Sequence, residues 1–308
     1  MRSARRRALI EKKKNSGKFT GLFLKIFLPV IVIAVLLVIL KLDTKYWNGN
    51  DKFALAFRLS SGDVAVSVLD PKLSEMTTLV IPGDTQVEVA RNYGELRIKN
   101  VWQLGVNEKL GGGLLAGTIA QNFLFPVFLW SDSDAAALSG SNLAGILHFI
   151  LFPKSTNITF GDRVSAGIFA MQTRGSGKNL LDLGKNQFLA KQKLNDGQLG
   201  YILSGVISPR LTVYFSDNDF AAKSLRVAIG DATGIAGVAD KVGQIIEVMG
   251  AKIVSVDKKS IADGGCTVFG SDNMAVKKVA ALFSCKVSRD KGNFDLEIDL
   301  SSAFAKKF

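Results

Sequence analysis

A run of nineteen residues near the N-terminus constrains this chain more than any other feature of its sequence. From Leu22 to Leu40 it reads LFLKIFLPVIVIAVLLVIL, in which Lys25 is the only charged residue. As a helix, such a run rises about 28 Å, which is close to the thickness of the hydrocarbon core of a bilayer. Lys25 lies one turn from the start of the run, where its side chain extends to the headgroups. The pattern predicts a transmembrane helix over residues 22–42.

A cleaved signal peptide is the alternative explanation of the apolar run. The run is long for a signal peptide, and no small-residue cleavage site follows it. Tyr46 and Trp47 follow instead, and both are typical of a membrane interface. Residues 1–25 carry nine basic side chains and one acid, and such a flank stays in the cytoplasm. We therefore expect a single-pass protein of the bacterial cell membrane, with a cytoplasmic tail over 1–21, a linker over 43–52 and an extracytoplasmic remainder.

The position of the charge also excludes several classes of function. The formal net charge is +12, but residues 1–25 hold +8 of it, which leaves +4 for the other 283 residues. The basicity is therefore a signal for membrane orientation, and we expect no nucleic-acid partner. One histidine and two cysteines exclude a multi-histidine metal centre and a four-thiolate zinc site. That histidine, His148, lies in an apolar run and is interpreted as a core residue rather than a catalytic one.

The extracytoplasmic part begins with residues typical of β-structure. The stretches 53–59 and 64–69 are apolar and are separated by Ser60-Ser61-Gly62-Asp63, which predicts a β-hairpin. The apolar runs 122–130 and 143–152 are too short to span a membrane, so we interpret them as buried core elements. These elements belong to a first domain that is predicted over 53–220. Its further strands are expected at 76–81 and 86–90, and its helices at 95–104, 111–122 and 132–148. A last helix is expected to follow residues 158–162 and to end at about residue 171.

The C-terminal part predicts a second, smaller α/β domain over residues 224–308. A strand at 225–229, a helix at 236–249 and a strand at 252–256 follow one another, which is the pattern of a βαβ unit. The remaining elements are expected as a strand at 266–269, a helix at 274–283 and a strand at 294–300.

Two carboxylates of the first domain are candidate metal ligands. Asp63 directly precedes one predicted strand and Asp84 follows another, so both are expected at the same sheet edge. Carboxylate oxygens are ligands that Mg²⁺ prefers in proteins. The alternative is that each aspartate caps a turn.

Two features of the second domain are also candidates for function or stability. Thr233, Gly234 and Gly237 lie in a turn between a strand and a helix, where backbone amides could bind a phosphate; the alternative is that the glycines serve backbone geometry. Cys266 and Cys285 are 19 positions apart in a part expected outside the membrane, which favours a disulfide over two buried thiols.

Several of these segments match motifs of one known family. Gly62-Asp63-Val64 and the stretch LVIPGDT over 79–85 correspond to an acidic pair and an IPRDT motif, and RIKNVWQLG over 97–105 corresponds to the helix after it. The stretch LRVAIGDATGIAGVA over 225–239 corresponds to a domain opening that reads V-x-V-x-N-G/A-T-x-x-x-G-L-A. On these segments the chain resembles the LytR-CpsA-Psr family of bacterial envelope proteins, followed by a LytR C-terminal domain. The resemblance implies a short cytoplasmic tail, one membrane helix and an exported α/β domain.

The resemblance also implies a site. Members with the full motif set transfer glycopolymers from a polyprenyl pyrophosphate to peptidoglycan, with Mg²⁺ and several arginines holding the pyrophosphate. Here Gly83 occupies the position of the IPRDT arginine, and no arginine-rich block follows; Arg163 and Arg174 stand alone. Arg97, with Lys99, is the nearest substitute for the lost charge. The implied catalytic residues are then Asp84 and Arg97, with Asp63 and Asp84 as the metal pair.

Three functions remain open from the sequence. We expect an envelope-biogenesis protein that binds wall glycan or lipid-linked glycan without the full catalytic machinery and without a firm cofactor. The first alternative is a Mg²⁺-dependent glycopolymer transferase that uses Asp63 and Asp84. The second alternative is a module that binds another protein of the envelope.

Overall fold

The computed structural model describes residues 27, 29–30, 44–47, 49–204, 209–290 and 292–308. Residues 1–43 and 44–308 form separate units, and both five-stranded sheets lie in the second. Among the described residues no helix is both long enough and apolar enough to cross a membrane. The cytoplasmic tail expected over 1–21 and nearly all of the transmembrane helix expected over 22–42 lie outside the described residues, so both stay predictions.

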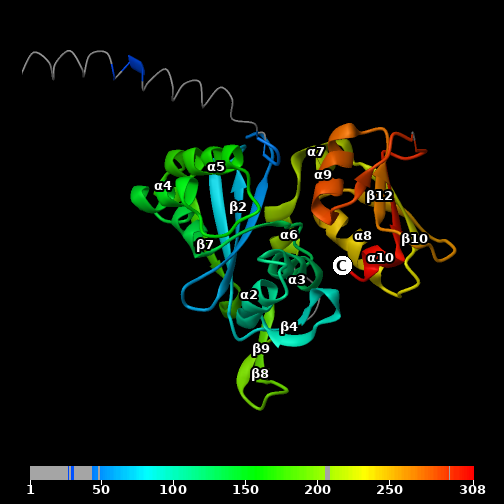
Figure 1. The fold of residues 1–308 in the computed structure, drawn as a ribbon, viewed down its shortest axis with the longest axis horizontal. Coiled ribbons are helices and arrows are strands. Elements are labelled where there is room, and N and C mark those ends of the chain that lie inside the picture. Colours follow the sequence, from blue (N-terminus) through cyan, green and yellow to red (C-terminus); the bar gives the residue numbers. More distant parts are fainter. Residues whose placement is uncertain (1–26, 28, 31–43, 48, 205–208, 291) are drawn as a thin grey trace, which may run out of the picture. The chain divides into compact units, whose positions relative to one another are not determined.

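A five-stranded mixed sheet forms the centre of the first half of this unit (Figure 1). Its strands lie in the order β6-β1-β2-β3-β7, with the bounds β1 (Phe53–Arg58), β2 (Val64–Asp70), β3 (Glu75–Ile81), β6 (Leu129–Ser131) and β7 (Lys178–Asp182). The predicted hairpin is confirmed, because β1 and β2 pair antiparallel with Phe53 opposite Leu69. β6 and β7 join the two edges in parallel.

Helices cover both faces of this sheet. Alternate side chains of β2 point to opposite faces, so Val66 packs in one buried cluster and Ala65 in another. The cluster around Val66 contains buried residues of α2 (Ile98–Asn107) and α3 (Gly113–Phe123). The cluster around Ala65 contains those of α4 (Leu143–Leu151) and α5 (Phe160–Gln172). This half is therefore a three-layer α/β/α arrangement.

Two hairpins and four short 3-10 segments complete this half. Their bounds are β4 (Gln86–Val89) with β5 (Gly94–Arg97), β8 (Leu189–Lys193) with β9 (Leu199–Leu203), η1 (Ala90–Asn92), η2 (Ser133–Leu138), η3 (Gly175–Gly177) and η4 (Leu183–Lys185). The helix expected at 95–104 begins only at Ile98, because residues 94–97 pair with 86–89 as a strand. The helix expected over 132–148 is two elements, since Asn142 caps a new helix through the amides of Ala144 and Gly145.

The second half is built on another five-stranded sheet, in the order β11-β10-β14-β12-β13. The bounds are β10 (Arg226–Ala232), β11 (Lys252–Lys258), β12 (Cys266–Phe269), β13 (Lys286–Val287) and β14 (Leu296–Ser301), with helices α7 (Asn218–Lys223), α8 (Val238–Val248), α9 (Asn273–Phe283) and α10 (Ser302–Ala305). Helix α6 (Pro209–Phe215) precedes them, and its Leu211 and Phe215 pack in the buried cluster of the first half. β10 and β11 are parallel and α8 connects them, which confirms the predicted βαβ unit. Val242 and Val279 bring α8 and α9 into one buried cluster with this sheet.

The apolar run 143–152 differs from its expected burial. Ile146, Phe149 and Ile150 are buried as expected, but the other side of α4 is open to solvent. His148 is on that open side, half exposed, with its Nδ1 3.5 Å from a carboxylate oxygen of Asp134. The interpretation of His148 as a core residue is therefore wrong, because the helix buries only one of its faces.

Candidate functional site

The two candidate metal ligands lie at the same edge of the first sheet. Asp63 precedes β2 and Asp84 follows β3, and these strands pair with Val64 opposite Ile81. The Asp63 carboxylate accepts a hydrogen bond from the backbone N–H of Gly83 at 2.8 Å. It also accepts one from the hydroxyl of Ser61 at 2.9 Å. Asp63 is thus held against the residue that precedes Asp84.

The Asp84 carboxylate is neutralised by two basic side chains. Nη1 of Arg97 lies 2.7 Å from Oδ1 of Asp84, and Nζ of Lys99 lies 2.6 Å from the same oxygen. These hydrogen bonds, first from Lys99 and then from Arg97, hold the pKa of Asp84 below its usual range. Asp84 and Arg97, the two catalytic residues that the resemblance implies, are therefore adjacent and bind each other.

A third carboxylate completes this group of charges. Asp196, which lies between β8 and β9, accepts hydrogen bonds from Nε of Arg97 at 2.7 Å and from Nη2 at 3.0 Å. The hydrogen bond from Arg97 is the main cause that lowers the pKa of Asp196 to about 2. The bidentate geometry uses the side of the guanidinium that a phosphate would occupy. Arg97 is consequently engaged on both sides by carboxylates of its own chain.

Gly83 leaves no room for the arginine of the family motif. A Cβ added at this position would lie 2.5 Å from the carbonyl oxygen of Gly62 and 3.1 Å from Cβ of Lys99. The neighbouring backbone is fixed, since the Lys99 N–H donates to the carbonyl of Gly83 at 3.1 Å. The glycine is thus required by a close backbone approach.

A small cavity adjoins this sheet edge and is lined by a basic residue, Arg58, that the sequence motifs do not single out. Its volume is about 240 Å³, which is below the roughly 300–1,000 Å³ of typical ligand pockets. Arg58 and Lys99 both line it, and the Arg58 guanidinium lies 5.3 Å from the ring centre of Trp102. Arg58 is the last residue of β1 and lies opposite Val64 in the hairpin. Its position in the predicted hairpin could therefore have identified it as a residue near the site.

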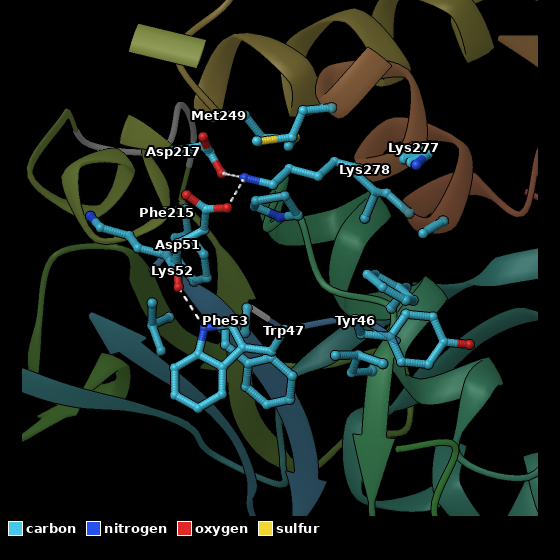
Figure 2. A pocket seen from close by; sticks show the side chains of 18 of the residues that line it. Tyr46, Trp47, Asp51, Lys52, Phe53, Phe215, Asp217, Met249, Lys277 and Lys278 are labelled. Carbon is cyan, nitrogen blue, oxygen red and sulfur yellow. Dashed lines mark hydrogen bonds and ion pairs between the residues drawn. The ribbon is translucent and has the colours of Figure 1, made fainter. Parts of the chain in front are cut away.

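A larger apolar cavity lies away from both candidate aspartates (Figure 2). Its volume is about 420 Å³, and it lies between the segment that precedes β1 and helix α9. Its apolar side chains include Tyr46, Trp47, Phe53, Phe128, Phe215, Met249 and Leu282. Four lysines, Lys45, Lys52, Lys277 and Lys278, also line it.

A second cavity of about 570 Å³ continues along the same helix. Lys45, Tyr46, Phe128, Ala281 and Leu282 line both cavities, so the two are adjacent. We refer to them together as the α9 groove. Neither Asp63 nor Asp84 lines the groove.

One lysine of the groove is bound to two carboxylates, as Figure 2 shows. Nζ of Lys278 lies 2.8 Å from Asp51 and 2.7 Å from Asp217. Burial lowers the pKa of Lys278, but the hydrogen bonds from Lys278 to Asp217 and Asp51 outweigh it, and the net shift is upward. Among the described residues, Asp51, Asp217 and Asp219 are the one group of three acids close enough to share a metal ion. The ammonium group of Lys278 already binds two of them.

The glycine-rich turn after β10 forms hydrogen bonds within itself. Asp231 accepts from the N–H of Thr233 at 3.0 Å and from its hydroxyl at 2.5 Å. Gly234 and Gly237 have positive φ angles of 73° and 83°, which favour glycine. The hydrogen bonds and the φ angles therefore explain why Asp, Thr and Gly occupy this turn. A ligand bound at the turn stays a prediction.

The two cysteines form the expected pair. The Sγ atoms of Cys266, on β12, and Cys285, two residues after the end of α9, lie at disulfide distance. The bond joins the end of α9 to the second sheet, and Cys266 is also part of the lining of the α9 groove.

Comparisons with known proteins give structural likeness only. No protein-family model matches the chain, and no curated protein sequence matches it. The structure of TagV from B. subtilis is 11% identical with a TM-score of 0.36, and the match covers 51% of this chain and 92% of TagV. The structure of TagT from B. subtilis is 12% identical with a TM-score of 0.36, and the match covers 52% of this chain and 87% of TagT. A structure described as the transcriptional regulator yvhJ from Bacillus subtilis is 11% identical with a TM-score of 0.38, and the match covers 55% of this chain and 99% of yvhJ. Likeness at this level carries no conclusion about function.

Proposed function

We propose that this chain is a membrane-anchored, extracytoplasmic protein of cell-envelope biogenesis that binds a lipid-linked or wall glycan without transferring it. The envelope role follows from the LytR-CpsA-Psr resemblance of residues 62–85, 97–105 and 225–239. The anchor follows from the predicted transmembrane helix over 22–42.

The self-neutralised charges at the sheet edge support binding without transfer. Transfer of a pyrophosphate-linked group needs positive charge aimed at the developing negative charge, and a metal ion with an open coordination position. Here Arg97 is bound by Asp84 and Asp196, while Lys99 is bound by Asp84. A metal ion at Asp84 would have to displace two cations. This arrangement of Arg97 is the observation that carries the proposal.

The α9 groove is the binding site that the geometry favours. It combines aromatic and aliphatic walls with lysines, as expected for an apolar chain that carries an anionic headgroup. Within the described part of the chain, Lys45 and Lys277 form no salt bridge, in contrast to Arg97 and Lys99. Thr44 to Trp47, which line the groove, directly follow the predicted membrane helix. A lipid-linked ligand would enter from that side.

A binding measurement tests this proposal. The full-length chain in detergent micelles is titrated with a polyprenyl pyrophosphate-linked glycan, and the affinity is compared with that of the Lys277→Glu and Lys286→Glu variants. Lys277 lines the groove, whereas Lys286, on β13, lines neither of its cavities. We expect saturable binding that Lys277→Glu weakens and Lys286→Glu leaves unchanged. Equal affinities of the two variants would contradict a ligand in the groove.

The transferase alternative keeps one supporting observation. Asp63 and Asp84 lie on either side of Gly83 at one sheet edge, where two carboxylates could contribute ligands to one metal ion. A measurable wild-type turnover of lipid pyrophosphate that Asp84→Ala abolishes would favour this alternative.

A further inference from the structure

Helix α4 presents a stripe of exposed leucines. Leu143, Leu147 and Leu151 are 54%, 45% and 51% exposed, and their spacing of four residues places them along one side of the helix. Phe152, which follows the helix, is 67% exposed. The opposite side of α4 packs into the core through buried residues such as Phe149. Helix α4 is therefore apolar on two sides. One side packs into the core, and the other exposes the leucine stripe to solvent.

Helix α5 extends this surface. Phe160 and Ile168 are both more than two-fifths exposed, and their spacing of eight residues places them on one side of α5. A Cβ added at Gly167, next to Ile168, would meet Ile146 and Ile150 of α4, so the two helices touch there. The two stripes thus flank the contact between the helices. We call this surface the α4–α5 face, formed by Leu143, Leu147, Leu151, Phe152, Phe160 and Ile168.

The α4–α5 face is attached to the start of the described body. Asp162, in the first turn of α5, is fully buried and accepts hydrogen bonds from the backbone N–H groups of Tyr46 at 3.2 Å and Trp47 at 3.0 Å. The ring of Trp47 lies 5.7 Å from that of Phe169 on α5. Thr44 follows the end of the predicted transmembrane helix by two residues, a reach of at most about 7 Å. Helix α5 is therefore fixed close to the point where the chain is predicted to leave the membrane.

The charges around the face favour an anionic partner. From Asp134 to Lys178 the basic residues are Lys154, Arg163, Arg174 and Lys178, and the acids are the buried Asp162 and also Asp134, whose carboxylate lies 3.5 Å from Nδ1 of His148. Lys154 and Arg174 are exposed, and the Arg163 guanidinium lies over the ring of Phe160 at 5.6 Å. Groups of exposed large apolar side chains mark interaction sites, and basic borders attract anionic lipid headgroups.

We propose that the α4–α5 face docks on the outer surface of the membrane. The leucines of α4 and Phe152 enter the boundary between headgroups and acyl chains, and Lys154 and Arg174 contact anionic headgroups. The inference rests on the anchor in the proposed function, because the anchor places the face beside the bilayer. Docking would fix the orientation of the body relative to the membrane.

Fluorescence quenching in vesicles tests the docking. The full-length chain with Leu147→Trp is reconstituted in vesicles of phosphatidylethanolamine and phosphatidylglycerol with brominated acyl chains. Leu199→Trp is the control, because Leu199 on β9 is 65% exposed and the β8–β9 hairpin lies at the bottom of the view in Figure 1, away from α4 and α5. After subtraction of the native tryptophans, we expect a severalfold larger loss of fluorescence at position 147 than at position 199.

The outcomes separate docking from anchoring. Vesicle flotation of the wild-type chain reports the anchor, and the difference in quenching reports the docking. Flotation with equal quenching at the two positions overturns the docking and leaves the anchor in place. A chain that does not float overturns the anchor, and the docking with it. Cross-linking between copies through Leu147→Cys, without quenching of Leu147→Trp, would show that the face binds a second chain and overturns the docking.

Discussion

The sheet edge at Asp84 and the α9 groove both gather basic side chains, but they differ in what neutralises them. At the sheet edge, Arg97 and Lys99 are bound by carboxylates of the same chain. In the groove, only Lys278 and Lys52 form salt bridges within the described residues, whereas Lys45 and Lys277 form none there. The comparison shows that the two regions hold similar cations but differ in which of them already have a carboxylate partner. We therefore expect an anionic ligand in the groove rather than at the sheet edge.

The largest effect is expected at Lys278. Lys278→Met leaves the buried carboxylates of Asp51 and Asp217 without their cation, which is expected to lower the free energy of unfolding by about 3–5 kcal/mol. The matched control is Lys277→Met, since Lys277 is exposed and its removal is expected to change stability by at most about 0.5 kcal/mol. Denaturation of the full-length chain in detergent by urea measures both. Equal losses in the two variants would show that the ion pairs of Lys278 are not structural.

The disulfide is expected to contribute nearly as much. Replacing Cys266 and Cys285 together by serine removes a cross-link between residues 19 positions apart. A loop of this size is expected to account for about 3 kcal/mol of stability. The same urea titration measures the loss, and reductant should then destabilise the wild type but not the double variant. A reductant effect of equal size in both proteins would contradict the bond.

The Gly83→Arg variant, which restores the arginine of the family motif, tests how closely the backbone is packed at the sheet edge. In Gly83→Arg the new side chain collides with the backbone of Gly62, and overpacking of this kind costs about 1–3 kcal/mol. Gly175→Arg is the control, because a Cβ there meets nothing within 4 Å. Thermal unfolding compares the two variants. A Gly83→Arg variant as stable as the wild type would show that the edge can open to receive the side chain.

The smallest effect concerns the pH dependence of the sheet edge. Arg97 lowers the pKa of Asp196 to about 2, against an ordinary value of about 3.9. Because the pKa is depressed in the folded state, this pair contributes stability above about pH 4 and loses it as the pH falls through about 2. In Arg97→Ala the pKa of Asp196 should return towards its ordinary value, as followed by NMR of its carboxyl carbon. An unchanged titration would refute the pairing.

The parts of the fold that could be predicted are those set by local pattern. The hairpin at residues 53–69 and the βαβ unit at residues 225–256 have their turn residues and their partner strands close in sequence. The strands within 174–200 were not predicted, because β7 pairs with β3 about a hundred positions earlier. The early start expected for α2 has a different, local cause: pairing with the strand at residues 86–89 overrides the helical preference of residues 95–97.

The candidate site shows the same division. The common edge of Asp63 and Asp84 follows from adjacent strands and could be predicted. The pairing of Arg97 with Asp196 could not, because the two residues are 99 positions apart. The exposed side of α4 was also missed, since an apolar run such as 143–152 does not reveal which of its faces the rest of the chain covers.

One measurement tests the central claim most directly. The full-length chain in vesicles is incubated with polyprenyl pyrophosphate-linked glycan, peptidoglycan and Mg²⁺, and both bound glycan and released polyprenyl phosphate are followed. We predict that the glycan is bound and that no polyprenyl phosphate is released above the level of the Asp84→Ala variant. Release by the wild type that Asp84→Ala abolishes would contradict it.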